Sequence, residues 1–334
     1  MMDLTRVNAY MERVSRSEHE TFKPVGSKLK VGLDLGTAYI VLVVLDEENN
    51  PIACEKRAAN VLKDGVVVDY SGSLRIVREL KAKLEERLGV ELTNCAIAMP
   101  AGTESSVRTH QYVAEGAGFE VTNVLDEPSA ANSIYQIDDG VVVDIGGGTT
   151  EIAVVSMGGV AECESIKTAG STFDEAIIRY IKKKHNMLIG AMTAEEVKIN
   201  IGGVYPRSDA PESMEVKGRD LIKGLPKTVS VTAEELVDVL REPARLILEN
   251  VHAVLERTPP ELIGDLGVNG MILSGGGSLL YGIDRMIEDS THIRTMIVDD
   301  PLACAAHGAG KLLTKLDSMQ DGMMNFLRNR EMRN

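Results

Sequence analysis

Val31–Leu45 reads VGLDLGTAYIVLVVL, and Val141–Val155 reads VVVDIGGGTTEIAVV, an imperfect second copy. In each copy an apolar run stops at an aspartate, turns through glycine and threonine, and resumes as a second apolar run. This pattern predicts a β-hairpin with a tight glycine-rich turn. Because glycine lets backbone N–H groups approach a ligand closely, such a turn can surround an anion, and the aspartate can hold a hydrated cation beside it. Two copies predict two facing turns around the phosphate chain of a metal-bound nucleotide.

The two turns differ in how specifically they indicate a ligand. The Asp-x-Gly-Thr pattern of the first copy is equally typical of a purely structural turn. Three glycines within an apolar hairpin weaken a strand, so the second copy needs a compensating role, for which phosphate binding is the natural candidate. The candidate binding residues are Asp34, Gly36, Thr37 and Ala38 in the first copy and Asp144, Gly146, Gly147 and Gly148 in the second.

Composition excludes several classes of function. A net charge of -14 argues against a nucleic-acid-binding surface, because phosphate contacts along a duplex need clustered Lys and Arg. ATP binding does not conflict with this charge, since a few backbone amides and one metal ion suffice. No apolar run reaches the ~18 residues of a transmembrane helix. The four cysteines are far apart and no signal peptide is evident, which predicts reduced thiols and a cytoplasmic location.

Alternating strand and helix patterns predict an α/β protein with largely parallel sheets. The length of 334 residues favours two domains. We expect a strand at 95–99, helices at 74–88 and 104–117, and a polar, Pro- and Gly-containing subdomain inserted at about 190–226. The expected division is an N-terminal extension at 1–30 with a short helix, a first lobe at 31–140 completed by a C-terminal helix at 301–316, a second lobe at 141–300, and a tail at 317–334.

A third glycine motif, Ser274-Gly275-Gly276-Gly277, follows an apolar strand and precedes a helical pattern that we place at 279–287. A helix beginning there would point free N–H groups and its positive end at an anion or nucleoside. This motif does not have the GxGxxG form, and the sequence contains no GxxxxGK[ST] loop. Dehydrogenase-type and P-loop sites are therefore disfavoured.

Asp126-Glu127-Pro128 precedes a further helical stretch and is typical of a helix start. Hairpin, Glu-Pro-helix, Gly-rich hairpin and strand-GGG, in this order, resemble the phosphate-1, connecting, phosphate-2 and adenosine motifs of the actin, Hsp70 and sugar-kinase superfamily. Residues 300–310, DPLACAAHGAG, match its last connecting helix. From about 141 to 313 the chain resembles MreB, the bacterial actin homologue. From 1 to about 139 it is more similar to EutJ, the chaperone-like protein of ethanolamine-utilisation operons.

The resemblance implies a two-lobed actin-like ATPase with ribonuclease-H-like lobes, ATP and Mg²⁺ in the cleft, and a role for each motif residue. Asp34 and Asp144 would lie near Mg²⁺ and the β- and γ-phosphates through water. Glu127 would orient the attacking water, with Asp144 and either Thr149 or Thr150 assisting. Gly275, Gly276 and Gly277 would contact the nucleoside. Glu195 and Lys198, which share a helix face, would lie at the ribose and adenine or else form an exposed ion pair.

Three functions remain open on the sequence. The first is an MreB-like cytoskeletal ATPase whose nucleotide state controls self-association. In MreB a small subdomain of the first lobe, with filament contacts and in many members a membrane-binding loop, occupies the place where this chain has only Asp46–Asp64. This shortening weakens the expectation of filaments. The second is a EutJ-type ATPase that acts on a client or microcompartment protein. The third, a small-molecule kinase, is disfavoured because the first lobe shows no insertion for an acceptor.

Overall fold

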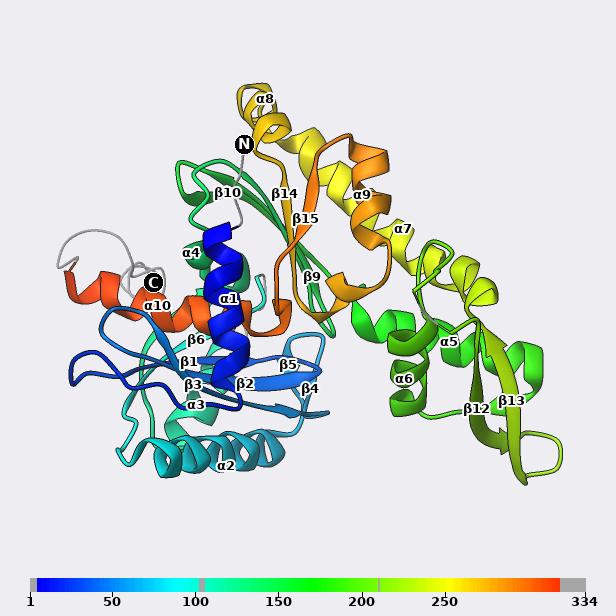
Figure 1. Cartoon of the computed structure of the whole chain (residues 1–334), viewed down its shortest axis with the longest axis horizontal. Helices are drawn as coiled ribbons and strands as arrows, with labels where there is room; N and C mark the ends of the chain where they lie inside the picture. Colours follow the sequence, from blue (N-terminus) through cyan, green and yellow to red (C-terminus); the bar gives the residue numbers. More distant parts are fainter. Residues whose placement is uncertain (1–4, 102–105, 210, 319–334) are drawn as a thin grey trace, which may run out of the picture.

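The computed structural model describes residues 5–101, 106–209 and 211–318, and Figure 1 shows them as two lobes with a smaller projecting subdomain. The first lobe is built on a five-stranded sheet in the order β3-β2-β1-β6-β7. The first glycine hairpin supplies β1 and β2, which are antiparallel, and β1 pairs in parallel with β6. The strands are β1 (Lys30–Leu35), β2 (Tyr39–Leu45), β3 (Pro51–Ala58), β6 (Asn94–Met99) and β7 (Glu120–Asp126).

The second lobe repeats this plan with the sheet order β10-β9-β8-β14-β15. The second glycine hairpin supplies β8 and β9, and β8 pairs in parallel with β14. The prediction of two related hairpins in two α/β lobes is thus confirmed. The strands are β8 (Gly140–Ile145), β9 (Thr150–Ser156), β10 (Gly159–Ile166), β14 (Met271–Ser274) and β15 (Thr295–Ile297).

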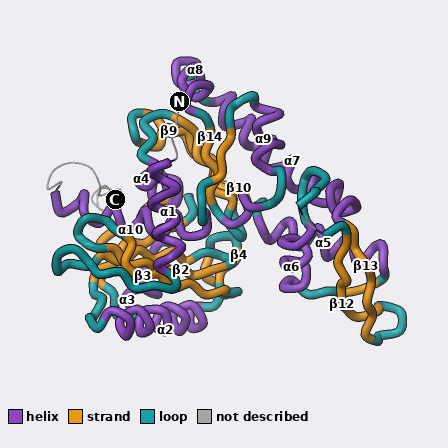
Figure 2. The backbone as a smooth tube through the Cα atoms, viewed as in Figure 1, coloured by secondary structure: helices purple, strands orange, loops and turns teal. Residues whose placement is uncertain are grey.

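Helices cover both sheets (Figure 2). In the first lobe α2 packs on β2 and β3, while α10 packs on β1 and β6. A capping box opens α7, because Thr232 accepts from the amide of Glu235 and the Glu235 carboxylate accepts in return. The main helices are α2 (Tyr70–Leu88), α3 (Val107–Gly116), α4 (Glu127–Tyr135), α5 (Gly170–His185), α7 (Ala233–Arg257), α8 (Pro260–Asn269), α9 (Ile283–Thr291) and α10 (Cys304–Ser318).

Some helices begin or end at residues that differ from those predicted. The helix expected over 104–117 begins at Val107, and residues 102–105 lie outside the described part of the chain. Helix α8 was not predicted, because its sequence PELIGDLGVN holds two glycines, a poor helix former. The tail expected at 317–334 lies outside the described residues beyond Ser318.

The inserted subdomain carries its own three-stranded antiparallel sheet, β11-β12-β13. This sheet extends past residue 226, the predicted end of the insertion, to Thr232. Figure 1 shows β12 and β13 projecting from the end of the molecule away from the first lobe. Its elements are β11 (Met187–Leu188), α6 (Ala191–Ile201), β12 (Ser213–Asp220) and β13 (Pro226–Thr232).

Helices α4 and α10 cross closely between the lobes. A Cβ added to Gly308 of α10 would overlap the carbonyl oxygen of Ala130 in α4, and one added to Gly32 of β1 would overlap the carbonyl oxygen of Ala306. Ser133 of α4 also donates to the Gly308 carbonyl (3.1 Å). Small residues within 300–310 therefore allow α10 to pack closely on α4 and β1.

The N-terminal extension forms α1 (Thr5–Ser17), which lies against β3. Its apolar side chains Val7, Met11 and Val14 are buried. Arg87 of α2 fixes the end of this helix by donating to the carbonyl oxygens of Ser17 (2.9 Å) and Glu20 (2.9 Å). Helix α1 is thus part of the packed core.

The segment between β2 and α2 is short. It contains β3, the turn after it, and two-residue strands β4 (Leu62–Lys63) and β5 (Val66–Val67), which pair with each other. Across the described residues, no helix is both long and apolar enough to cross a membrane.

Candidate functional site

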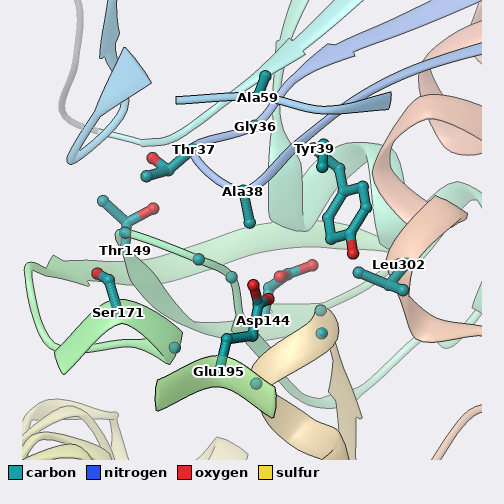
Figure 3. Close-up of a pocket in the computed structure, with 18 of the residues that line it drawn as sticks. Gly36, Thr37, Ala38, Tyr39, Ala59, Asp144, Thr149, Ser171, Glu195 and Leu302 are labelled. Atoms are coloured by element: carbon teal, nitrogen blue, oxygen red, sulfur yellow. The ribbon is translucent and has the colours of Figure 1, made fainter. Parts of the chain in front are cut away.

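A cavity of about 650 Å³ lies between the lobes, and both glycine turns line it (Figure 3). The first lobe contributes the end of β1 and the turn that follows it. The second lobe contributes the end of β8, the turn that follows it, and the glycines that follow β14. All but one of the predicted site residues line this cavity. They are Asp34, Gly36, Thr37, Ala38, Glu127, Asp144, Gly146, Gly147, Gly148, Thr149, Glu195, Lys198, Gly275, Gly276 and Gly277.

The two turns meet each other at one side of the cavity. A Cβ added to Gly147 would lie 2.8 Å from the Cβ of Ala38, and one added to Gly148 would lie 2.5 Å from the Thr37 hydroxyl. The amide of Gly146 closes its turn by donating to the Thr149 carbonyl (2.9 Å). Within the described part of the chain, the amides of Gly147 and Gly148 make no hydrogen bond. These two amides are therefore available to an anion.

Asp34 and Asp144, each next to the last residue of β1 or β8, face the cavity from opposite lobes. Asp144 is buried and accepts a hydrogen bond from the Ser274 hydroxyl (2.7 Å). One carboxylate oxygen of half-buried Asp34, Oδ1, is shielded from solvent and has no hydrogen-bond partner among the described residues. Burial raises the pKa of Asp34, and the nearby Asp144 raises it further. Burial also raises the pKa of Asp144, against the lowering effect of Ser274.

Glu127 is the first residue of α4 and is buried at the cavity wall. The preceding Asp126 caps this helix by accepting from the Ser129 amide (2.8 Å), and Pro128 fits the first turn. This capped start fixes the position of the Glu127 backbone. Burial is the largest cause of the raised pKa of Glu127, followed by the negative charge of Glu151 and then that of Asp34.

Glu151, which the sequence interpretation missed, belongs to the same acidic cluster. It is fully buried in β9 and accepts from the Ala101 amide (2.6 Å) of the first lobe. Its other oxygen has no partner in the described structure, and burial raises its pKa. The available signal was a carboxylate inside the apolar run of a hairpin strand, since such a group is costly to bury without a purpose.

Thr150 is the predicted site residue that does not reach the cavity. It is fully buried, and its hydroxyl donates to the carbonyl of Thr168 (2.7 Å). Successive side chains of a strand point to opposite faces, so Thr149 lines the cavity while Thr150 points away. Of the two alternatives, only Thr149 is placed to assist a ligand.

The expectation that Gly275–Gly277 open an α-helix is wrong. These residues lead into a 3-10 helix of four residues, Gly276–Leu279, and α9 begins only at Ile283. Gly275 has φ +75° and Gly282 has φ +80°, conformations that interrupt a continuous helix. A Cβ on Gly277 would also lie 2.9 Å from the Ile145 carbonyl oxygen. The glycines therefore permit close packing on β8 beside the cavity.

Lys198 and Glu195 both line the cavity from α6, but they do not pair with each other. Lys198 forms an ion pair with Asp174 (2.9 Å) and donates to the Gly170 carbonyl (3.2 Å). Figure 3 shows Glu195 pointing into the cavity. Three exposed apolar side chains that the sequence interpretation did not single out also line this wall: Met192, Ile199 and Leu279. This wall is thus apolar with a polar edge, which suits an aromatic base and a ribose.

The charge of the cavity is strongly asymmetric. Five carboxylate side chains and one lysine line it among the described residues, and the lysine is already paired. No group of three or more His, Cys, Asp or Glu in the described part of the chain is arranged to hold a metal ion directly. The unpartnered Asp34 oxygen and the facing Asp144 nevertheless fit a hydrated divalent cation, which prefers oxygen ligands and retains water.

Comparison with known proteins agrees with this architecture. The sequence model of the MreB/Mbl protein family matches residues 54–321, so this likeness extends across most of the first lobe as well as the second. The cell shape-determining protein Mbl of Bacillus cereus is 35% identical over 324 residues, which cover 86% of this chain and 97% of the relative.

Two solved structures share the fold over nearly the whole chain. MreB5 of Spiroplasma citri bound to ADP matches with a TM-score of 0.76 and 29% identity, covering 89% of this chain and 99% of that one. The ethanolamine utilization protein EutJ from Carboxydothermus hydrogenoformans matches with a TM-score of 0.71 and 30% identity, covering 91% and 97%. The fold is that of the actin-like ATPases, and the chain belongs to the MreB/Mbl family.

Proposed function

We propose that the chain binds ATP with Mg²⁺ in the cavity between its lobes, hydrolyses it, and uses the nucleotide state to control its self-association in a cell-shape role. The observation that carries this proposal is the meeting of the two glycine turns, Gly147 against Ala38, with Asp34 and Asp144 beside them. The ADP-bound MreB5 structure and the cell shape-determining relative support the choice of ligand and of role.

The polar groups suit a metal-bound phosphate chain better than a bare anion. Acidic side chains outnumber basic ones along the cavity, so an uncompensated triphosphate would be repelled. A bound Mg²⁺ would neutralise phosphate charge, and Asp34 and Asp144 would hold it through water. The free amides of Gly147 and Gly148 would donate to phosphate oxygens.

Glu127 is the residue to which we assign water orientation. Its helix start is fixed by the Asp126 cap, and its carboxyl group lies at the cavity wall. Phosphoryl transfer needs positioning and charge stabilisation above all, so one acid that holds the water is sufficient. Thr149, which also lines the cavity, would assist by hydrogen bonding.

A specific observation favours a second candidate, a EutJ-type ATPase that acts on a protein client without forming filaments. The segment between β2 and α2 is short, with only β3 and the two-residue strands β4 and β5. The EutJ structure also matches the chain almost throughout. In this case lobe closure would be coupled to a client or microcompartment protein.

Sedimentation and electron microscopy of the full chain with Mg-ATP test the proposal. Filaments that form with ATP and are lost on Asp144→Asn substitution would support the MreB-like role. A protein that hydrolyses ATP yet stays monomeric at high concentration would favour the client-directed alternative. A phosphorylated metabolite formed in proportion to ADP would instead establish a kinase.

A further inference from the structure

Tyr135, the last residue of α4, carries a buried hydroxyl group that packing alone does not explain. The side chain is 6% exposed, and its hydroxyl is shielded from solvent with no partner in hydrogen-bonding geometry among the described residues. Burying an unpaired hydroxyl is costly, whereas phenylalanine would fill the same space without that cost. A tyrosine at this position therefore indicates a partner that the hydroxyl gains when the lobes move.

Sheet register and packing place Tyr135 beside the aspartate of the second glycine turn. Strand β8 pairs in parallel with β14, with Asp144 opposite Ser274. Alternate residues of a strand share a face, so Val142 and Ile272 lie on the same face as this pair. Tyr135 packs in one apolar cluster with Val142 and Ile272. Its ring therefore lies on the face of the sheet that carries Asp144.

Three polar side chains adjoin the Tyr135 hydroxyl. Burial is the largest cause of the raised pKa of Tyr135; the Cys304 thiol and Asp144 raise this pKa further, and the Ser274 hydroxyl lowers it. The thiol is a weak hydrogen-bonding group and faces the Asp300 carbonyl (3.9 Å). Ser274 donates its single proton to Asp144 (2.7 Å), so it can only accept from the tyrosine. The bond open to Tyr135 is thus donation to the Ser274 oxygen.

We propose that Tyr135 is a positioning residue for the metal-bound nucleotide: when the lobes close on Mg-ATP, its hydroxyl donates to Ser274, and Ser274 holds the Asp144 carboxylate toward the cation. The inference rests on the function proposed above for the cavity. Both hydrogen bonds run toward the carboxylate, and bonds arranged in such a chain strengthen one another in a buried site. Tyr135 acts through Ser274 and does not touch the nucleotide.

Helix α4 connects this contact to movement of the lobes. It begins at Glu127, to which we assign water orientation, and ends nine residues later at Tyr135. Its last turn is fixed, because the Gln136 amide donates to the Asn132 carbonyl (2.7 Å) and the Asn132 side chain bonds both backbone groups of Ile137 (3.2 and 3.3 Å). The helix packs on α10 and on β8 of the second lobe (Figure 1). A change in the angle between α4 and β8 therefore moves both ends of α4 at once.

Calorimetric titration of Tyr135→Phe tests the inference, with Mg-ATP and with ATP in EDTA. The Kd for Mg-ATP should rise about fivefold, as for the loss of one hydrogen bond, while ATP without metal should bind as it does to the wild type. Ser274→Ala should weaken Mg-ATP binding by itself, and Tyr135→Phe should add nothing to it, because both residues act through one chain of bonds. Additive losses would overturn the inference. Tyr70→Phe is the matched control, since its hydroxyl donates to a backbone carbonyl at the surface (3.1 Å).

Urea unfolding without nucleotide separates this role from a purely structural one. Tyr135→Phe should be at least as stable as the wild type, because the hydroxyl that it removes has no partner in the described structure. A less stable variant would show that the hydroxyl is already paired and would overturn the inference. An unchanged Kd for Mg-ATP in Tyr135→Phe, beside a wild type that binds Mg-ATP, would overturn the inference alone. A wild type that does not bind Mg-ATP would overturn the proposed function together with it.

Discussion

Gly147 in the second glycine turn lies directly against Ala38 in the first: a Cβ added to Gly147 would be 2.8 Å from the Ala38 Cβ and 2.9 Å from the Ala38 backbone nitrogen. This contact joins two lobes whose hairpins occupy equivalent places in their sheets. It sets the separation of the two turns, and therefore the width of the phosphate-binding part of the cavity.

Gly147→Ala should lower nucleotide affinity about tenfold or more, because the added methyl group would force the turns apart. Isothermal titration calorimetry with Mg-ATP measures the effect. Gly159→Ala is the control, since the nearest atom to its added Cβ, the Ser156 carbonyl oxygen, is 3.8 Å away. Wild-type affinity in a folded Gly147→Ala variant would show that the turns do not contact the nucleotide.

Asp144→Asn should remove most Mg-dependent ATP binding, on the order of a hundredfold, because the second turn would lose the charge that holds the cation. The amide is nearly isosteric and can keep the contact with Ser274, so the fold should persist. Titrations with and without Mg²⁺ separate the metal contribution. Asp139→Asn, which changes a carboxylate bonded to Ser156 on the surface, serves for comparison. An unchanged affinity with Mg²⁺ would refute this role of Asp144.

Glu127→Gln should retain ATP binding while slowing phosphate release about a hundredfold, because one carboxylate oxygen that can hold the attacking water is replaced by an amide group that only donates hydrogen bonds. Single-turnover phosphate assays at saturating ATP isolate the chemical step. The exposed Glu115→Gln of α3 controls for a general change in charge. A turnover rate equal to the wild type would exclude Glu127 as the water-orienting acid.

Local patterns predicted the parts of the site that are continuous in the chain. The glycine turns, the strands that carry Asp34 and Asp144 near their ends, and the capped start of α4 all follow from residues within a few positions of one another. Glu151 could not be found in this way, since its contact with Ala101 joins segments from two lobes. The partner of Lys198 was likewise missed, because Asp174 lies on a different helix.

Backbone conformation explains the error at Gly275–Gly277. A strand followed by glycines and an amphipathic pattern resembles a strand-to-helix turn. The chain instead adopts positive φ at Gly275 and again at Gly282, and the helix starts after the second of these. Glycine permits both conformations, so the sequence alone does not distinguish them.

Gly308→Ala should destabilise the protein by about 3 kcal/mol, because the added methyl group would overlap the Ala130 carbonyl where α10 crosses α4. Gly264→Ala in α8 is the opposite case: nothing lies within 4 Å of its added Cβ, so improved helix propensity should stabilise by up to about 1 kcal/mol. Urea unfolding of both variants measures the difference. A Gly308→Ala variant with the same unfolding free energy as the wild type would show that the two helices can separate without cost.

Stability should fall as the pH drops below about 6.5 because of His307 in α10. Burial lowers the pKa of His307 to about 3, from an ordinary value of 6.5. Both ring nitrogens lack partners among the described residues, and the ring packs edge-on against Tyr10 of α1 (6.1 Å between centroids). At a pH between these two pKa values, His307 is protonated in the unfolded chain and neutral in the folded chain. Lowering the pH therefore favours unfolding.

His307→Phe tests this pH dependence, since it keeps an aromatic ring beside Tyr10 and removes the titrating group. Between pH 7.5 and 5.5 the wild type should lose about 1.4 kcal/mol of unfolding free energy through this residue, and the variant should lack that loss. Urea unfolding at the two pH values gives the comparison, with the exposed His19→Gln as control. The same pH dependence in His307→Phe and wild type would mean that His307 is protonated without opening the contact between α1 and α10.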